Sequence, residues 1–493
     1  MTDPVELELQ LRLIDKDTYK DLLADPVFKK SAKPAKRVEF ETTYFDTAEH
    51  RLQKNGFAFR IRKSVDGYTA TIKNRGTDGG GLFARNEWNA PASSEEPSID
   101  VFGDLPVGKR LAEIVGVEAL LPVFKTVVSR TYVLISPEEG SVVELSADTG
   151  EVTCQGRSEE ICEIELELKK GPAHCIFKIA QELASRYPLL PEENSKYLRG
   201  LMLAGLAVAP DSGKKQKSLR FNKNAGYQTI SALLLNHLDA VTGAQGNFIR
   251  SPLPKTIHQL RISVRTFRSL LYLLKPLCGM EAYRTMQEEF GVFARRFSRI
   301  RDLDVLMRSA DAFRQKNPDG AVEAGEFIQW MQEKRMEENR LLHQALSAGW
   351  ATPMLLRAKA FLLRLHEDGG VIKEDRIYSA ICSRFKKKLG KFKKDYKNTD
   401  FSDPKAVHAL RIQCKKLNYS LQFLNADKKE ETATEKDLKK LQKVLGQYCD
   451  IGNFLRIAGE YREQGQGDAL QDFIRQKDAE RIKFTKKVMR LQP

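Results

Sequence analysis

The spacing of the hydrophobic residues changes once along this chain of 493 residues, near residue 210. Before that point, apolar and polar residues alternate in short runs, for example at 5–13, 57–62 and 161–168. Alternation with a period of two predicts β-strands. After that point, apolar residues recur every three or four positions, which predicts long amphipathic helices. We therefore expect an α+β protein with two domains, 1–208 and 220–490, joined by a polar linker at 209–219.

Several predicted strands of the first domain carry like charges on one face. Glu6 and Glu8 share a face of the first strand, and Glu163, Glu165 and Glu167 form a second acidic row, because side chains alternate along a strand. Other strands carry rows of Arg and Lys. Carboxylates that share a face repel one another unless cations lie opposite. A closed barrel with a charged interior would bring both signs together around a polyanion with bound metal.

Charge is divided unequally between the two halves of the chain. Residues 1–210 contain 27 Lys and Arg against 33 Asp and Glu, whereas residues 211–493 contain 54 against 33. The basic half favours a polyanionic partner such as nucleic acid, polyphosphate or an anionic membrane surface. The seven Cys form no C-x-x-C pair, which argues against a disulfide framework or a structural zinc site. No signal segment or bilayer-spanning apolar stretch is evident, so we expect a cytoplasmic protein without a membrane partner.

The helical half contains an internal repeat with an offset of 150 residues. The sequence HQLRISVR at 258–265 recurs as HALRIQCK at 408–415, and Asp302 and Asp450 follow the two His residues by 44 and 42 positions. Cations at positions i, i+3 and i+7 share one helical face, where like charges favour an anionic partner. A duplicated helical unit, forming two related bundles packed together, explains this pattern. Because the half has no aromatic platform for stacking bases, nucleic acid is the weaker alternative to polyphosphate.

The first domain resembles the CYTH superfamily, the triphosphate tunnel metalloenzymes. The segments that carry the resemblance are ELELQ at 6–10, YFDT at 44–47, FRIR at 59–62, TIK at 71–73, RNE at 85–87, Arg130, CEIELE at 162–167 and SKY at 195–197. The resemblance implies an eight-stranded antiparallel tunnel that binds a triphosphate. It implies Mg²⁺ or Mn²⁺ as cofactor, metal ligands Glu6, Glu8, Glu163 and Glu165, and substrate ligands Arg60, Arg62, Lys73, Arg85, Arg130 and Lys196.

One position departs from the family signature Glu-x-Glu-x-Lys. Gln10 stands in place of the Lys and can hydrogen-bond a phosphate or a carboxylate, but it brings no charge. Arg12 is next on that face, about 6.6 Å along the strand, and is a further candidate for substrate binding. We expect Glu6, Glu8 and Gln10 to form the catalytic strand of an inorganic triphosphatase that releases pyrophosphate and phosphate. The alternatives are a protein that binds triphosphate without turnover and, ranked lower, an adenylate cyclase or a thiamine triphosphatase.

The second domain resembles the CHAD family, on residues 258–268, 301–306, 408–416 and 445–450. The resemblance implies duplicated four-helix bundles with a basic pore that binds inorganic polyphosphate, and hence association of the protein with polyphosphate granules. The residues implied to face polyphosphate are His258, Arg261, Arg265, Arg268, Arg301, His408, Arg411, Lys415 and Lys416.

Overall fold

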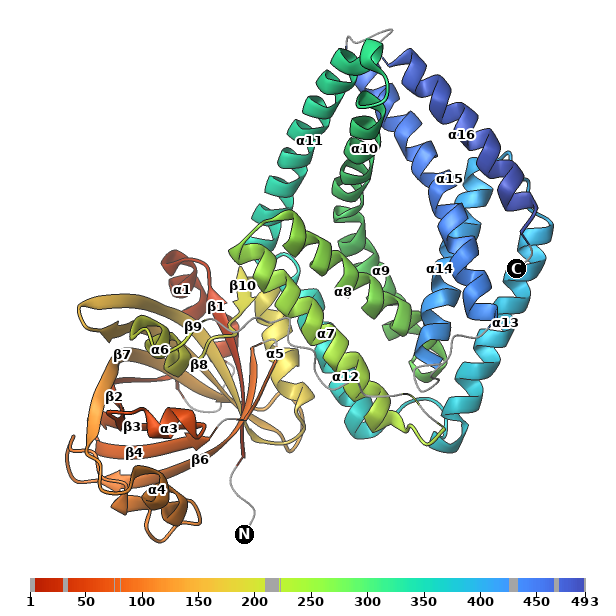
Figure 1. Cartoon of the computed structure of the whole chain (residues 1–493). Helices are drawn as coiled ribbons and strands as arrows, with labels where there is room; N and C mark the ends of the chain where they lie inside the picture. The colour runs from red at the N-terminus through yellow and green to blue at the C-terminus, as the bar shows by residue number, and fades with distance from the viewer. Residues whose placement is uncertain are drawn as a thin grey trace. The chain divides into compact units, whose positions relative to one another are not determined.

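The computed structural model describes residues 5–29, 34–74, 76–79, 81–208, 221, 223–424, 433–464 and 470–491. The predicted linker at 209–219 lies outside these residues. The contacts divide the chain into two compact units, Met1–Lys214 with Ser347–Arg364, and Lys215–Leu346 with Leu365–Pro493. The first unit contains the sheet and the second is helical, which confirms the predicted fold class (Figure 1).

The sheet of the first unit closes into an eight-stranded antiparallel barrel. Neighbouring strands follow one another around the barrel in the order β1, β9, β8, β7, β2, β3, β4 and β6. The barrel closes because β6 pairs with β1. Two short strands, β5 (Thr77–Gly79) and β10 (Leu189–Pro191), pair with β6 and β1. The barrel strands are β1 (Val5–Leu13), β2 (Lys36–Thr47), β3 (Phe57–Ser64), β4 (Gly67–Asn74), β6 (Leu82–Ala92), β7 (Leu120–Ile135), β8 (Val142–Cys154) and β9 (Arg157–Lys170).

The barrel turns its apolar faces outward and its polar faces inward. Leu9 and Leu11 of β1 are fully buried in a core that lies outside the barrel wall, whereas Glu8 and Gln10 of the same strand line the interior. Helices cover the outward faces and remove them from water, which stabilises the wall. They are α1 (Lys16–Leu23), α2 (Pro26–Lys29), α3 (Arg51–Lys54), α4 (Gly108–Val115) and α5 (His174–Ala184).

Helix α6 (Lys196–Leu203) approaches the barrel wall very closely. A Cβ at Gly200 would lie 2.1 Å from the ring of Phe124 in β7, so only glycine permits this contact. The ring of Tyr44 stacks on Phe124 at 4.4 Å between centroids and tilts against Tyr197 of α6 at 5.6 Å. This aromatic cluster fixes the helix whose first residue, Lys196, reaches the barrel interior.

The second unit is built from two copies of one four-helix pattern. Three pairs of helices begin 150 residues apart, at 227 and 377, at 254 and 404, and at 321 and 471. The fourth pair differs, because α9 and α10 of the first copy correspond to the single helix α15 of the second. The helices are α7 (Tyr227–Arg250), α8 (Pro254–Leu273), α9 (Met280–Arg296), α10 (Ser298–Arg314), α11 (Ala321–Ser347), α13 (Ile377–Lys397), α14 (Pro404–Leu424), α15 (Ala433–Glu463) and α16 (Gln471–Met489). The duplication predicted from the repeated motif is therefore present in the fold.

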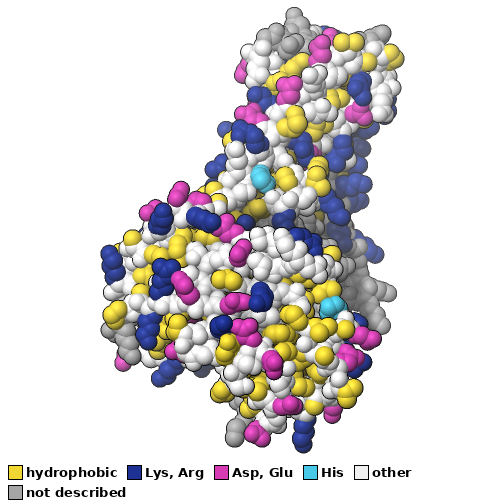
Figure 2. All heavy atoms as spheres, turned by 90° about the vertical axis from the view of Figure 1, so that its left-hand side faces the viewer, with side chains coloured by type: hydrophobic (Ala, Val, Ile, Leu, Met, Phe, Trp, Pro, Cys, Tyr) yellow, Lys and Arg dark blue, Asp and Glu magenta, His cyan; other side chains and the backbone are white. Residues whose placement is uncertain are grey.

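The helix that connects the two copies, α12 (Thr352–Asp368), contributes to the core of the first unit. Leu356 is 3% exposed in the cluster that covers the outside of the barrel, and the ammonium of Lys359 lies 5.6 Å from the centroid of Phe177 in α5. Among the described residues, no helix is both long and apolar enough to cross a membrane. On the face drawn in Figure 2, basic and acidic side chains are interspersed over the barrel unit.

Candidate functional site

The interior of the barrel holds a cavity of about 1040 Å³ that is lined by charged residues of both signs. The charged residues in its lining are Glu6, Glu8, Arg60, Arg62, Lys73, Arg85, Glu87, Arg130, Glu144, Glu165, Glu167, Lys169, Glu193 and Lys196. Threonines at 42, 71 and 126 add hydroxyl groups. We call this space the tunnel cavity. Its lining confirms the expectation that the charged rows face one enclosed space.

One side of the tunnel cavity is organised around Lys73 of β4. Its ammonium lies 2.6 Å from Glu6 Oε2 and 2.5 Å from Glu87 Oε2, and Arg60 lies 3.9 Å from the other oxygen of Glu87. Burial opposes ionisation of Glu87, but Lys73 and Arg60 outweigh it and hold the pKa of this carboxyl well below its usual range. Burial raises the pKa of Glu6, and the like charge of Glu87 adds to that rise. Lys73 therefore joins a carboxylate of β1 to one of β6.

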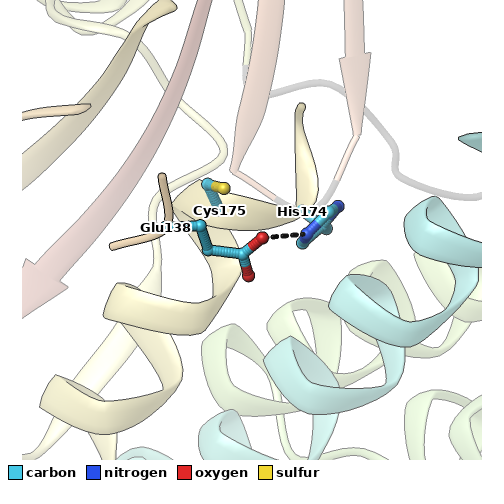
Figure 3. Close-up of side chains that lie close together, drawn as sticks. All are labelled: Glu138, His174 and Cys175. Carbon is cyan, nitrogen blue, oxygen red and sulfur yellow. Dashed lines mark hydrogen bonds and ion pairs between the residues drawn. The ribbon is translucent and has the colours of Figure 1, made fainter. Parts of the chain in front are cut away.

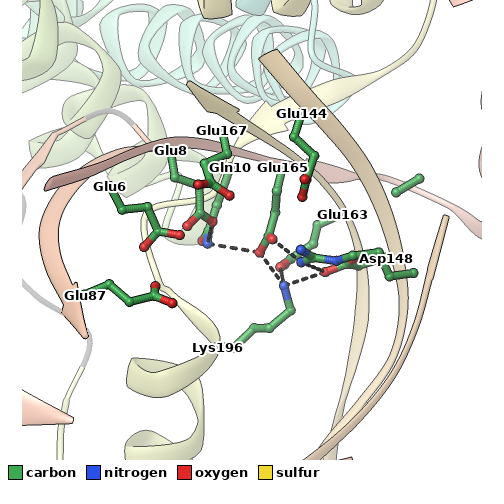
Figure 4. A network of polar contacts seen from close by, with 12 residues as sticks. Glu6, Glu8, Gln10, Glu87, Glu144, Asp148, Glu163, Glu165, Glu167 and Lys196 are labelled. Carbon is green, nitrogen blue, oxygen red and sulfur yellow. Dashed lines mark hydrogen bonds and ion pairs between the residues drawn. The ribbon is translucent and has the colours of Figure 1, made fainter. Parts of the chain in front are cut away.

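Gln10 joins β1 to β9 in the middle of the site (Figure 4). Its amide Nε2 donates to Glu165 Oε1 at 3.2 Å and also to Glu8. Burial raises the pKa of Glu8 to about 8, and the neighbouring carboxylates of Glu165 and Glu6 contribute to this rise. Three carboxylates therefore crowd together here with a neutral amide between two of them. Of these carboxylates, Glu8 has only the neutral Gln10 amide as its described hydrogen-bond partner, and a bound cation would supply positive charge there.

The other side of the tunnel cavity is organised around Asp148 of β8, which is fully buried. Arg130 donates two hydrogen bonds of 2.7 Å to its two oxygens, and Lys196 donates another of 2.9 Å. Lys196 also contacts Glu165 Oε1 at 2.5 Å and Glu163. Burial opposes ionisation of Glu165, but Arg130 and Lys196 hold its pKa well below the usual range. These paired charges fix the geometry of this wall.

The carboxylates of the barrel include one group with the spacing of cation ligands, and the ammonium of Lys196 already lies within it. Asp148, Glu163 and Glu165 each place a carboxylate oxygen within 4.8 Å of the others. Carboxylate oxygens are the ligands that Mg²⁺ and Mn²⁺ prefer. A second group of carboxylates is formed by Glu6, Glu8 and Glu165. Lys73 pairs with Glu6 and Lys196 with Glu165, whereas Glu8 contacts the neutral amide of Gln10, so a cation could bind at Glu8.

Two predicted residues lie away from the lining of the tunnel cavity. The side chain of Arg12 is 52% exposed and lies 3.8 Å from Glu192. Glu163 is 1% exposed and is held by Arg199 at 3.0 Å as well as by Lys196. The remaining tunnel residues predicted from the sequence all line the cavity.

Arg62 differs from the other cations of the tunnel cavity. Its guanidinium lies 4.2 Å from the centroid of Phe40, and its buried Nε has no hydrogen-bond partner among the described residues. Burial and the neighbouring cations Arg60 and Arg130 together lower the pKa of Arg62 to about 10. A buried cation with cationic neighbours is the kind of group that an anion stabilises.

The second cluster of predicted residues lies where α8 and α14 pack against each other. We call the following set the basic seam: His258, Arg261, Arg265 and Arg268 of α8, and His408, Arg411, Lys415 and Lys416 of α14. The guanidinium of Arg265 lies 5.3 Å from the ring centroid of Tyr419 on the opposite helix. Burial lowers the pKa of Lys415 to about 8, and Arg411, Arg265 and Arg261 add to this effect. The two repeated motifs therefore meet in one site.

The basic seam contains cations that protein carboxylates do not fully pair. The Nε atoms of Arg265, Arg268 and Arg411 are buried without a hydrogen-bond partner among the described residues. Arg411 reaches Asp450 only at 3.6 Å. The carboxylate of Asp304 is already paired with Arg335, at 2.6 Å. Burial lowers the pKa of Arg261 to about 10, with Arg265 and Arg301 adding to the effect, so Arg301 also lies near the seam.

Family models match both units of the chain. The model of the CYTH domain matches residues 5–201, and the model of the CHAD domain matches residues 232–452. The chain has an N-terminal CYTH domain and a C-terminal CHAD domain. This confirms both resemblances on which the sequence predictions depend.

Individual relatives are more distant. A curated protein of Haemophilus influenzae named inorganic triphosphatase is 30% identical over 176 residues, which are 34% of this chain and 47% of that protein. The chain thus spans about half the length of this relative. The CHAD domain of the plant Ricinus communis is 22% identical, with a TM-score of 0.44 over 56% of this chain and 91% of that one. A proposed adenylyl cyclase of Hippeastrum with a dominant triphosphatase activity is 19% identical, with a TM-score of 0.33 over 41% and 97%.

The charged residues of the CYTH site that sequence reasoning missed include Asp148, Glu144 and Arg199. Glu144, Ser146 and Asp148 share one face of β8, and Asp148 pairs directly with Glu163 in the β8–β9 register. This alternation was a usable signal. Arg199 is 4% exposed and holds Glu163 and Glu159 from α6, at 3.0 and 2.6 Å. Its helical position gave no such signal.

A smaller cluster of possible ligand groups lies outside the tunnel lining of the CYTH domain (Figure 3). Glu138 Oε2 lies 3.4 Å from His174 Nε2, and Cys175 lies beside them. Lys178 also reaches Glu138, at 3.5 Å. Cys175 is fully buried in the core that covers the barrel. These contacts tie the segment between β7 and β8 to the start of α5.

Proposed function

We propose that the CYTH domain hydrolyses a triphosphate, with inorganic triphosphate as substrate and pyrophosphate and phosphate as products. The observation that carries the proposal is the enclosed tunnel cavity, which combines a carboxylate cluster with a row of cations. A chain of phosphates with a bound divalent cation needs both signs in one place. Turnover of such a substrate depends on positioning and charge stabilisation and needs no protein nucleophile.

The cations of the tunnel would bind the phosphate oxygens. Arg62 is the first candidate, because its Nε is unpartnered and its neighbours Arg60 and Arg130 are cations. Lys73 and Lys196 are shared with carboxylates and would hold the ends of the phosphate chain in register with them. Arg85 lies in the same lining, with its guanidinium 4.2 Å from the centroid of Phe83. These residues orient the chain and hold it away from bulk water.

Glu6, Glu8 and Glu165 would hold Mg²⁺ or Mn²⁺. Gln10 would set the spacing of Glu8 and Glu165, because its amide contacts both. When bound, the cation supplies Lewis-acid charge neutralisation and lowers the pKa of water. We assign Glu163 the role of positioning Lys196, since it is buried between Lys196 and Arg199.

The test is release of phosphate from inorganic triphosphate by the full chain with Mg²⁺ or Mn²⁺, compared with a Glu6→Gln/Glu8→Gln variant. Glu39→Gln/Glu95→Gln is the matched control, because it removes two carboxylates whose side chains are 71% and 51% exposed. Turnover in the wild type and the control but not in the tunnel variant supports the proposal. Equal turnover in all three proteins contradicts it.

A second candidate function is binding of triphosphate without turnover. The observation that favours it is Gln10, whose neutral amide lies between Glu8 and Glu165 where a Lys would bring a charge. The Gln10→Lys variant separates the two functions. If wild-type protein binds triphosphate without releasing phosphate and Gln10→Lys gains turnover, the binding function is correct.

For the CHAD domain we propose binding of inorganic polyphosphate along the basic seam. The arginines of the seam support this assignment, because three of their Nε atoms have no hydrogen-bond partner in the described part of the chain and guanidinium groups bind phosphate oxygens well. Binding should weaken steeply with salt, since each neutralised phosphate releases a counterion. Retention of polyphosphate by an Arg261→Gln/Arg411→Gln variant at the wild-type affinity would refute the assignment.

A further inference from the structure

A second basic pocket lies beside the seam, on another side of α14. It has a volume of about 160 Å³ and is lined by Tyr272, Lys388, Lys391, Gln413 and Leu417. Gln413 and Leu417 each follow a seam residue of α14 by two positions, which is about 200° around a helix. The pocket therefore lies on a different side of α14 from Arg411 and Lys415. Two lysines of α13 form its basic wall.

Lys416 connects the seam to this pocket. Its ammonium lies 4.6 Å from the ring centroid of Tyr272, which lines the pocket. Arg384 of α13 lies 4.9 Å from the same ring and donates to the Tyr272 carbonyl oxygen at 3.3 Å. Burial lowers the pKa of Lys416, and Arg268 and Lys388 lower it further. Arg268 belongs to the seam and Lys388 to the pocket, so one row of cations runs from the first to the second.

The pocket has an excess of positive charge. Burial lowers the pKa of Lys388, with Arg384, Lys391, Lys275 and Lys387 adding to the effect. The carboxylate of Asp395 lies next to the pocket, and Gln413 donates to it at 3.0 Å. Lys388 is partly buried, whereas lysines usually extend their ammonium groups into water. An anion in the pocket would relieve this repulsion.

We propose that the pocket is a second phosphate subsite, so that a long polyphosphate chain held in the basic seam continues past Lys416 to Lys388 and Lys391. This inference rests on the polyphosphate binding proposed for the seam. A phosphate chain fits better than a nucleic acid, because Lys416 and Arg384 already lie against the Tyr272 ring and leave it a poor platform for a base. The pocket would then add affinity for long chains.

The test is a titration of the full chain with long-chain inorganic polyphosphate at several salt concentrations. The variant Lys388→Gln/Lys391→Gln removes the pocket lysines. The matched control Lys393→Gln/Lys394→Gln removes the same charge from two exposed positions of α13. We expect the pocket variant to raise Kd about tenfold and to reduce the salt slope by about 1.4, with less than half of each effect in the control.

Equal effects of the two variants would overturn the subsite while leaving the seam in place. A third variant, Arg261→Gln/Arg411→Gln, reports on the seam itself. If the wild type binds polyphosphate and this variant does not, the proposed function holds whatever the pocket variant shows. If the wild type binds no polyphosphate, both proposals fail. A single-stranded RNA with the same number of phosphates tests the alternative ligand. If the wild type binds this RNA more tightly than polyphosphate, and the pocket variant weakens that binding, the pocket is a nucleic-acid site and the inference is overturned.

Discussion

The tunnel cavity and the basic seam both concentrate cations, but their charges are balanced differently. In the tunnel, Lys196 contacts Asp148 and Glu165 at 2.9 and 2.5 Å, and Lys73 joins Glu6 to Glu87. In the seam, the Nε atoms of Arg265, Arg268 and Arg411 have no hydrogen-bond partner among the described residues, and neighbouring cations lower the pKa of Lys415. A site of both signs can hold a metal together with a polyanion. A site of largely unpaired cations can hold the polyanion alone.

We expect the largest effect from substitutions that remove carboxylates from the tunnel cavity. Either Glu8→Gln or Glu165→Gln should lower turnover of triphosphate by at least about 100-fold, because each takes charge from the proposed metal site. Polyphosphate affinity of the seam should stay within about twofold of the wild type. Phosphate release and a polyphosphate titration on the same preparations check both. Loss of polyphosphate binding in these variants would contradict the division of roles.

We expect the second-largest effect from substitutions that remove cations from the basic seam. Arg261→Gln/Arg411→Gln should weaken polyphosphate binding by about 10- to 100-fold and reduce the salt slope by about 1.4, since two phosphate contacts are lost. Its turnover of triphosphate should match the wild type. A titration at three salt concentrations gives the slope, and an unchanged slope would count against direct phosphate contacts.

We expect a smaller effect, on stability, from replacing one glycine by alanine in each of the two domains. Gly200→Ala should lower the free energy of unfolding of the CYTH domain by about 1–3 kcal/mol, because its Cβ would overlap the Phe124 ring. Gly446→Ala in α15 is the control, since nothing lies within 4 Å of its Cβ, and it should stabilise the CHAD domain by about 0.5–1 kcal/mol. Thermal unfolding measures both. An unchanged melting temperature for Gly200→Ala would show that α6 is not seated as described.

The smallest effect is a pH dependence of the seam. Burial and the cations of Arg411, Arg265 and Arg261 lower the pKa of Lys415 to about 8, with Asp450 as the opposing charge. The ammonium is thus mostly present at pH 7 and mostly lost at pH 9, so polyphosphate binding should weaken by about three- to tenfold as the pH rises.

The Lys415→Arg variant tests this assignment, because a guanidinium keeps its charge through this range. It should lose most of the difference in polyphosphate affinity between pH 7 and pH 9, and Lys416, whose pKa is also lowered, would account for the rest. The seam histidines do not confuse the result, since burial lowers the pKa of His258 and His408 below 6.5. A wild-type affinity that is constant between pH 7 and pH 9 would rule out the role of Lys415.

The sequence predicted those features that depend on period and spacing. The acidic row of β1 and the lysine of β4 follow from alternation, and the equivalence of α8 and α14 follows from the repeated motif. Alternation alone does not say which face of a strand is enclosed. The closed barrel of the structure shows that the charged faces point inward.

Other features depend on contacts that no local pattern encodes. Arg12 continues the face of Gln10, yet its side chain leaves the cavity and approaches Glu192 beyond the barrel strands. The close approach of Gly200 to Phe124 joins segments about 75 residues apart in the chain. Likewise, nothing in the amphipathic pattern of α12 predicted that Leu356 belongs to the core of the first unit.

The most direct test measures two properties on each of three proteins: the wild type, Glu6→Gln/Glu8→Gln, and Arg261→Gln/Arg411→Gln. The properties are phosphate release from inorganic triphosphate with Mg²⁺ or Mn²⁺, and affinity for long-chain polyphosphate. We predict that the tunnel variant loses only phosphate release and that the seam variant loses only polyphosphate affinity. Loss of both properties in either variant, or retention of both in the tunnel variant, would contradict the assignment of turnover and binding to two separate sites.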